Sequence, residues 1–203
     1  MAEESGLAPV IFRWFWQQAM ERVASMNAEQ REGVKLILPV SPSLLMQEGG
    51  VEWITEVVQR NGIQAEQIFV ELPESSFAVR HTQLASVLNQ LRKNGFHLIL
   101  DNFGTGFAPL KLLRDIPYSL LRLGNLFVAS INDSRGDRAI IKGVLNLAHE
   151  MGLMVMASEV NQLEQYQFLR ESGCDWLSGE AVLQQIDSLP QQMEAMGMFV
   201  FPG

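Results

Sequence analysis

The chain has 203 residues, of which 47% are hydrophobic and 19% are charged, a composition typical of one folded globular domain. The formal net charge of -8 argues against binding to a nucleic acid polymer, which requires clustered lysine and arginine. No apolar run approaches the roughly 20 residues of a membrane helix, and the N-terminal residues lack the features of a signal peptide. We therefore expect a cytoplasmic protein with no membrane-inserted segment.

Short apolar runs alternate with longer amphipathic stretches along the chain. Ile11, Phe15, Ala19 and Val23 recur at helical spacing after Pro9, a residue favoured in the first turn of a helix. Beyond this first helix, we expect strands over residues 34–40, 68–72, 97–101, 119–123, 153–157 and 175–177. We expect further helices over residues 51–60, 83–94, 110–114, 138–151, 162–171 and 186–196.

This alternation of strands and helices with short connections predicts βα units and a parallel sheet. Six units are too many for a small open sheet and too few for a closed barrel of eight strands. The pattern therefore predicts one domain that is an incomplete barrel.

Acidic residues gather where two neighbouring strands are expected to end. Glu71 and Asp101 lie at the ends of the second and third predicted strands, and Glu74 lies in the loop after the second. Ligands of parallel βα folds bind at this edge of the sheet, and converging carboxylates are what Mg²⁺ requires. The residues alone leave two interpretations open: a degraded metal site, or solvated loop acids and helix caps.

The most specific motif is LILDNFGTGFAPL at residues 98–110, which resembles the Asp-Asp-Phe-Gly-Thr-Gly loop of EAL-domain cyclic-di-GMP phosphodiesterases. Six further segments resemble that family in the same order, at residues 2–7, 40–42, 71–74, 121–128, 157–165 and 173–179. The resemblance implies an α/β fold, a partial TIM-like (β/α) barrel of the EAL type with about six parallel strands. The chain begins after the position of the Glu-Ala-Leu motif. We therefore expect residues 1–203 to form a degenerate EAL-like domain without the first two barrel strands.

Enzymes of this family hydrolyse cyclic di-GMP with water bound to Mg²⁺ or Mn²⁺. The resemblance implies that Glu71 and Asp101 correspond to two metal ligands and are retained as vestigial acids. Elsewhere, Pro39 stands for the family's asparagine, Asn102 for an aspartate, Arg122 for a lysine, Gly124 for an aspartate, Ser158 for a glutamate and Ser178 for a glutamine. Because metal ligands generate the nucleophile, we expect no catalytic residues, no bound metal and no cofactor.

The resemblance and these substitutions lead to a main hypothesis and two alternatives. The main one is a catalytically inactive regulatory domain in bacterial cyclic-di-GMP signalling, which binds a protein partner or a second copy of itself at open barrel edges. The first alternative is a receptor that binds cyclic di-GMP without hydrolysis, through Glu71, Asp101, Asn102, Arg122, Ser158 and Ser178. An active phosphodiesterase completed by a partner ranks last, because the substitutions remain whatever is added.

Overall fold

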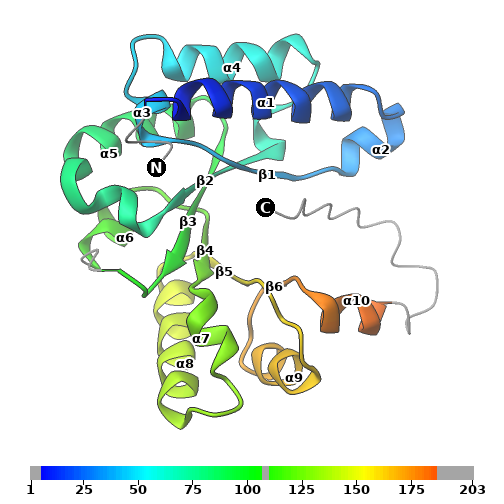
Figure 1. The fold of residues 1–203 in the computed structure, drawn as a ribbon, viewed down its shortest axis with the longest axis vertical. Coiled ribbons are helices and arrows are strands. Elements are labelled where there is room, and N and C mark those ends of the chain that lie inside the picture. Colours follow the sequence, from blue (N-terminus) through cyan, green and yellow to red (C-terminus); the bar gives the residue numbers. More distant parts are fainter. Residues whose placement is uncertain (1–5, 107–109, 187–203) are drawn as a thin grey trace.

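The computed structural model describes residues 6–106 and 110–186, in which six parallel strands form one curled sheet (Figure 1). The strands are β1 (Leu36–Pro39), β2 (Ile68–Pro73), β3 (His97–Phe103), β4 (Leu120–Leu123), β5 (Met154–Ala157) and β6 (Trp176–Leu177). Their order in the sheet is their order in the chain, and each pairs in parallel with the next. A consecutive order without reversal is the order of a (β/α) barrel, so the predicted partial barrel is confirmed.

Helices lie outside the curled sheet, with α1 and α4 on one side and α7, α8 and α9 on the other (Figure 1). The helices are α1 (Ala8–Ala24), α2 (Ala28–Gly33), α3 (Pro42–Leu45), α4 (Gly50–Arg60), α5 (Phe77–Lys93), α6 (Lys111–Asp115), α7 (Asn125–Ala129), α8 (Arg135–Glu150), α9 (Leu163–Glu171) and α10 (Glu180–Ile186). Two 3₁₀ turns precede and follow β2, at η1 (Ala65–Gln67) and η2 (Glu74–Ser76). No helix in this described part of the chain is long and apolar enough to cross a lipid bilayer.

The helix predictions require two corrections. Helix α5 begins at Phe77 rather than at residue 83, because turn η2 leads directly into it and the Phe77 side chain is buried. Helices α2, α3, α7 and α10 were not predicted, and α10 follows β6 almost at once. Apart from Ile186, the helix predicted over residues 186–196 lies outside the described residues.

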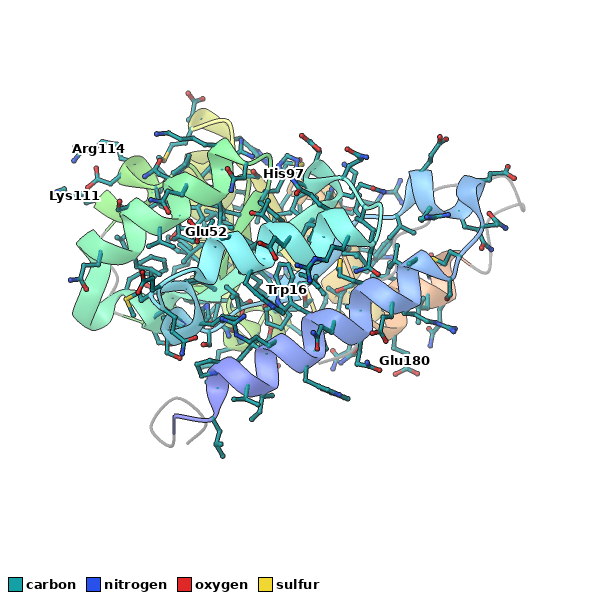
Figure 2. The ribbon with its side chains drawn as sticks, turned by 90° about the horizontal axis from the view of Figure 1, so that it is seen from above. Trp16, Glu52, His97, Lys111, Arg114 and Glu180 are labelled. Atoms are coloured by element: carbon teal, nitrogen blue, oxygen red, sulfur yellow. The ribbon has the colours of Figure 1, made fainter. Side chains whose placement is uncertain are left out.

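The buried side of the first helix only partly overlaps its predicted apolar stripe: Val23 is buried and Phe15 and Ala19 are partly buried against the core, but Ile11 is not. Ile11 is 50% exposed, whereas Trp16, Met20 and Val23 are buried. Figure 2 shows Trp16 pointing from α1 into the protein, and its indole Nε1 donates a hydrogen bond of 2.8 Å to the carbonyl oxygen of Pro39. This bond ties α1 to the end of β1, at the edge of the sheet where a ligand would bind.

The inner face of the sheet carries two layers of side chains. Phe69, Ile99, Leu120 and Met156 form a buried apolar layer. Side chains alternate between the two faces of a strand, so a residue two positions further along projects from the same face. On β2, β3 and β4 those next residues are polar: Glu71, Asp101 and Arg122. A polar layer therefore lies above the apolar layer, towards the carboxyl ends of the strands.

Candidate functional site

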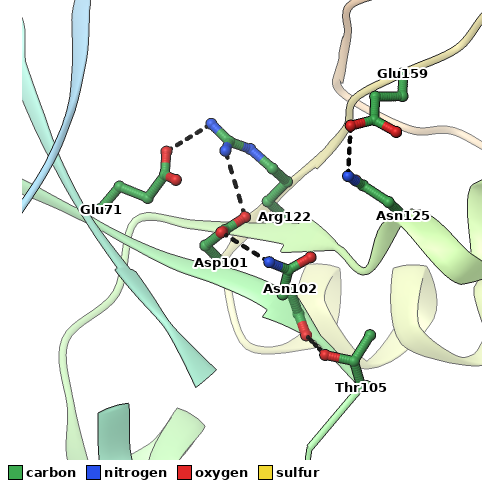
Figure 3. Close-up of polar contacts among 7 residues, drawn as sticks. All are labelled: Glu71, Asp101, Asn102, Thr105, Arg122, Asn125 and Glu159. Carbon is green, nitrogen blue, oxygen red and sulfur yellow. Dashed lines mark hydrogen bonds and ion pairs between the residues drawn. The ribbon is translucent and has the colours of Figure 1, made fainter. Parts of the chain in front are cut away.

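The guanidinium of Arg122 lies between the two retained acids (Figure 3). Its Nη2 atom is 2.7 Å from Glu71 Oε2, and its Nη1 atom is 3.3 Å from Asp101 Oδ1. The three side chains are only 13–15% exposed. Three adjacent strands thus contribute one cation and two carboxyl groups to a single cluster, which we call the ion triad.

Burial and charge act in opposite directions on the Glu71 carboxyl. Burial raises its pKa from the usual 4.5 to about 6, although the positive charge of Arg122 lowers it, and repulsion from Asp101 raises it further. Loss of hydration therefore outweighs the nearby cation. The Arg122 Nε atom is also buried and has no hydrogen-bond partner among the described atoms.

Asn102 extends the ion triad towards the loop after β3. Its Nδ2 atom donates a hydrogen bond of 3.1 Å to Asp101 Oδ2. The residue has a φ of +54°, in the left-handed region that asparagine tolerates better than most residues. The Thr105 hydroxyl donates to its carbonyl oxygen at 2.7 Å (Figure 3). The side chain of Asn102 therefore supports Asp101, and its backbone is fixed by the loop.

Glu74 binds the backbone of the same loop, the loop after β3. Its buried Oε2 atom accepts hydrogen bonds from the backbone nitrogens of Gly104 at 2.9 Å and Gly106 at 3.0 Å. The sequence suggested Glu74 only as one of the acids at the strand ends. Its partners lie 30 and 32 residues away, so the spacing of residues near Glu74 carried no signal of this contact.

Other residues contact two of the substituted positions, Gly124 and Pro39. A Cβ atom added at Gly124 would lie 2.3 Å from the Thr105 methyl, so this methyl occupies the space where a side chain at residue 124 would begin. Pro39 has no side-chain oxygen, and its carbonyl oxygen accepts from Trp16. Neither contact is visible in the sequence, because each joins residues that lie far apart in the chain.

The structure brings together four of the six predicted binding residues: Glu71, Asp101, Asn102 and Arg122. Ser158 and Ser178 follow β5 and β6, and within the described part of the chain neither hydroxyl forms a hydrogen bond with the ion triad. Glu159, the residue after Ser158, does not extend to the ion triad. Its Oε1 atom accepts from Asn125 at 2.7 Å, away from the ion triad (Figure 3).

The ligand donors of this site are few. Residues 6–106 and 110–186 contain no group of three or more histidine, cysteine, aspartate or glutamate side chains placed to hold a metal ion. Magnesium prefers near-octahedral coordination by oxygen atoms. The two carboxyl groups that could contribute oxygens each have one oxygen facing Arg122. Any metal ion in this site would therefore compete with Arg122 for the carboxyl oxygens of Glu71 and Asp101.

A curled sheet of consecutive parallel strands, with polar residues at their carboxyl ends, defines a partial (β/α)-barrel domain, a fold whose ligands bind at this edge of the sheet. The chain belongs to the EAL domain family, whose model matches residues 1–185. The family resemblance found in the sequence is thus confirmed.

Relatives of the chain include bacterial signalling proteins. The cyclic di-GMP phosphodiesterase NbdA of Pseudomonas aeruginosa is 26% identical over 179 residues, which is 88% of this chain and 23% of that protein. An uncharacterized signaling protein of Caulobacter vibrioides is 28% identical over 203 residues, which is 100% of this chain and 24% of that protein. The chain thus spans about a quarter of the length of these relatives.

A solved complex of the PaMucR phosphodiesterase with cyclic di-GMP has the same fold. The TM-score is 0.83 at 24% sequence identity, and the match covers 89% of this chain and 73% of that chain. This likeness agrees with the strand order of the sheet.

Proposed function

We propose that this chain is a non-catalytic regulatory domain in cyclic-di-GMP signalling and that it acts by binding another protein. The observation that carries the proposal is the ion triad. In metal-dependent hydrolysis, acids hold a cation that lowers the pKa of bound water. Here Glu71 and Asp101 instead face the guanidinium of Arg122, at 2.7 Å and 3.3 Å.

The neighbouring strand ends support loss of hydrolysis. Pro39 and Gly124 provide no side-chain oxygen, and the space beside Gly124 is taken by the Thr105 methyl. Ser158 has a hydroxyl where an acid would be required. Restoring one ligand would therefore leave the others missing, and we expect no measurable turnover.

An exposed apolar stripe on α1 supports a protein-binding role. Leu7, Val10, Ile11 and Trp14 are 50–65% exposed, and their spacing places them on one side of the helix. Clusters of large exposed apolar side chains commonly mark contact surfaces. Strands β1 and β6 each have one neighbour in the described sheet, and an unpaired strand edge also favours association.

Cyclic-di-GMP binding without hydrolysis is the second candidate function. Arg122 favours it, because a guanidinium at the ligand edge of the sheet is suited to phosphate. However, a phosphate would have to displace Glu71 or Asp101, which already accept from this side chain. We therefore rank it below protein binding.

The decisive experiment incubates the chain with cyclic di-GMP and either Mg²⁺ or Mn²⁺, and separates the linear product by chromatography. Calorimetric titration with the same nucleotide measures binding. We expect neither product nor heat of binding. Metal-dependent turnover would overturn the non-catalytic proposal, and binding without turnover would favour the receptor.

The contact surface is tested by sedimentation of the native chain and of Trp14→Glu. Leu183→Glu is the matched control, because Leu183 is 63% exposed but lies on α10. If the chain pairs with a second copy through α1, only Trp14→Glu abolishes association. Equal behaviour of the two variants would rule out α1 as the self-association surface.

A further inference from the structure

We infer that Arg122 is the permanent counter-ion of Glu71 and Asp101 and excludes a divalent cation from the ion triad. The guanidinium then has the charge-neutralising role that a metal ion has in a cluster of acids. This inference deepens the proposed non-catalytic function and rests on it. It names Arg122 as the side chain that prevents cation binding and predicts that a cation binds when Arg122 is removed.

The geometry of Arg122 suits it to hold both carboxyl groups. A guanidinium is a planar fork whose nitrogens can donate to two carboxylates at once. In this site, Nη2 contacts Glu71 and Nη1 contacts Asp101. The three residues project from β2, β3 and β4, which are hydrogen-bonded neighbours in the sheet. Because all three backbones are held by the sheet, the contact is built into the fold and is not a chance meeting of long surface side chains.

Burial makes a positive charge necessary beside Glu71 and Asp101. Two carboxylates with 14% and 13% exposure repel one another and lose most of their hydration, so such a pair requires a positive charge. Asn102 also contacts the pair, but it is neutral and donates one hydrogen bond to Asp101. Among the contacts described, the positive charge that Glu71 and Asp101 require therefore comes from Arg122.

Arg122 and a metal ion would compete for the same carboxyl oxygens. A divalent cation bound to both carboxyl groups would have to displace the guanidinium from Glu71 Oε2 and Asp101 Oδ1 or share those atoms with it. The Arg122 side chain is only 15% exposed and its Nε atom is buried, so the displaced charge would stay close to the metal. Repulsion between these two cations disfavours metal binding.

The test measures Mn²⁺ binding by the loss of the free-ion signal in electron paramagnetic resonance. The samples are the native chain, Arg122→Met, and the control Arg114→Met. Methionine keeps an unbranched apolar stem without the charge. Arg114 is 71% exposed and pairs with Asp115 at the surface. We expect weak or undetectable binding by the native chain and the control, and at least tenfold tighter binding by Arg122→Met.

The double variant Arg122→Met with Glu71→Gln shows where the gained Mn²⁺ binds, and we expect it to lose the gain. Two results would overturn the inference: tight Mn²⁺ binding by the native chain that Glu71→Gln removes, or a folded Arg122→Met that binds no better than the native chain. If Arg122→Met does not fold, thermal melting of the native chain and Glu71→Gln with and without Mn²⁺ decides. Stabilisation that requires Glu71 would overturn the inference, and its absence supports it.

The nucleotide assay keeps this inference separate from the proposed function. Binding of Mn²⁺ to the native ion triad without turnover would overturn only the counter-ion role of Arg122. Metal-dependent turnover would overturn the proposed function as well.

Discussion

Replacing Arg122 with methionine should destabilise the protein strongly and in a pH-dependent way. Removing one member of a buried ion cluster costs about 3–5 kcal/mol, because the remaining charges are left unpaired. The ion triad is 13–15% exposed and Glu71 can take up a proton, so we expect the lower end, about 3 kcal/mol at pH 7.5. At pH 5, Glu71 with its pKa of about 6 is mostly neutral, and we expect about 1–2 kcal/mol for the remaining pair.

Urea denaturation followed by circular dichroism measures both values, provided that native and variant proteins share the same dependence on urea concentration. The control Arg114→Met removes a surface pair and should cost less than about 1 kcal/mol at either pH. If Arg122→Met lowers the free energy of unfolding by less than about 1 kcal/mol at pH 7.5, Arg122 is not the charge that stabilises the two buried acids. An equal loss at the two pH values would contradict the expected pH dependence.

Three further predictions follow from the contacts around the ion triad. The pKa of Glu71 is about 6 in the folded protein and 4.5 ordinarily, so the folded state holds this proton more tightly. Its contribution of about 2 kcal/mol is present below pH 4.5 and lost as the pH rises through 6. Unfolding free energies from pH 4.5 to 7.5 should therefore fall more steeply for the native protein than for Glu71→Gln, and parallel curves would contradict this. Glu74→Gln should cost about 2 kcal/mol, because two backbone bonds lose a charged acceptor, and should speed amide exchange in the loop that it holds. Unchanged exchange there would argue against this role. Gly124→Ala should cost about 1–2 kcal/mol by crowding the Thr105 methyl, and Thr105→Ser should relieve most of that cost. Additive effects of the two changes in a double-mutant cycle would show that the crowding is absent.

The strands and most helices could be predicted because their signals are local. Apolar runs alternate with amphipathic stretches, and this periodicity indicates βα units whatever the rest of the chain does. The same pattern placed Glu71 and Asp101 at the ends of two neighbouring strands, and the structure brings their side chains to the same guanidinium.

The orientation of α1 was less predictable, because both sides of this helix carry large apolar residues. Ile11 and Trp14 are as suitable for a core as Trp16 and Met20 by hydrophobicity alone. The structure buries the second pair and seats Trp16 on the Pro39 carbonyl oxygen. Packing against the end of β1 therefore selects the buried side, and helical periodicity does not.

The succession of βα units, the family, and which family site residues are replaced can all be read from the amino-acid sequence, since these depend on residue identity and order. The contacts of Arg122 cannot, because they form only in the folded protein. Its acidic partner Asp101 lies 21 residues away, and Glu71 comes from a strand still further back. The three meet because β2, β3 and β4 are neighbouring parallel strands whose alternate side chains share one face, and the β3–β4 register shifts between Leu100 and Phe103, where Asp101 lies. A contact that depends on the relative placement of three strands cannot be read from the spacing of residues along one chain.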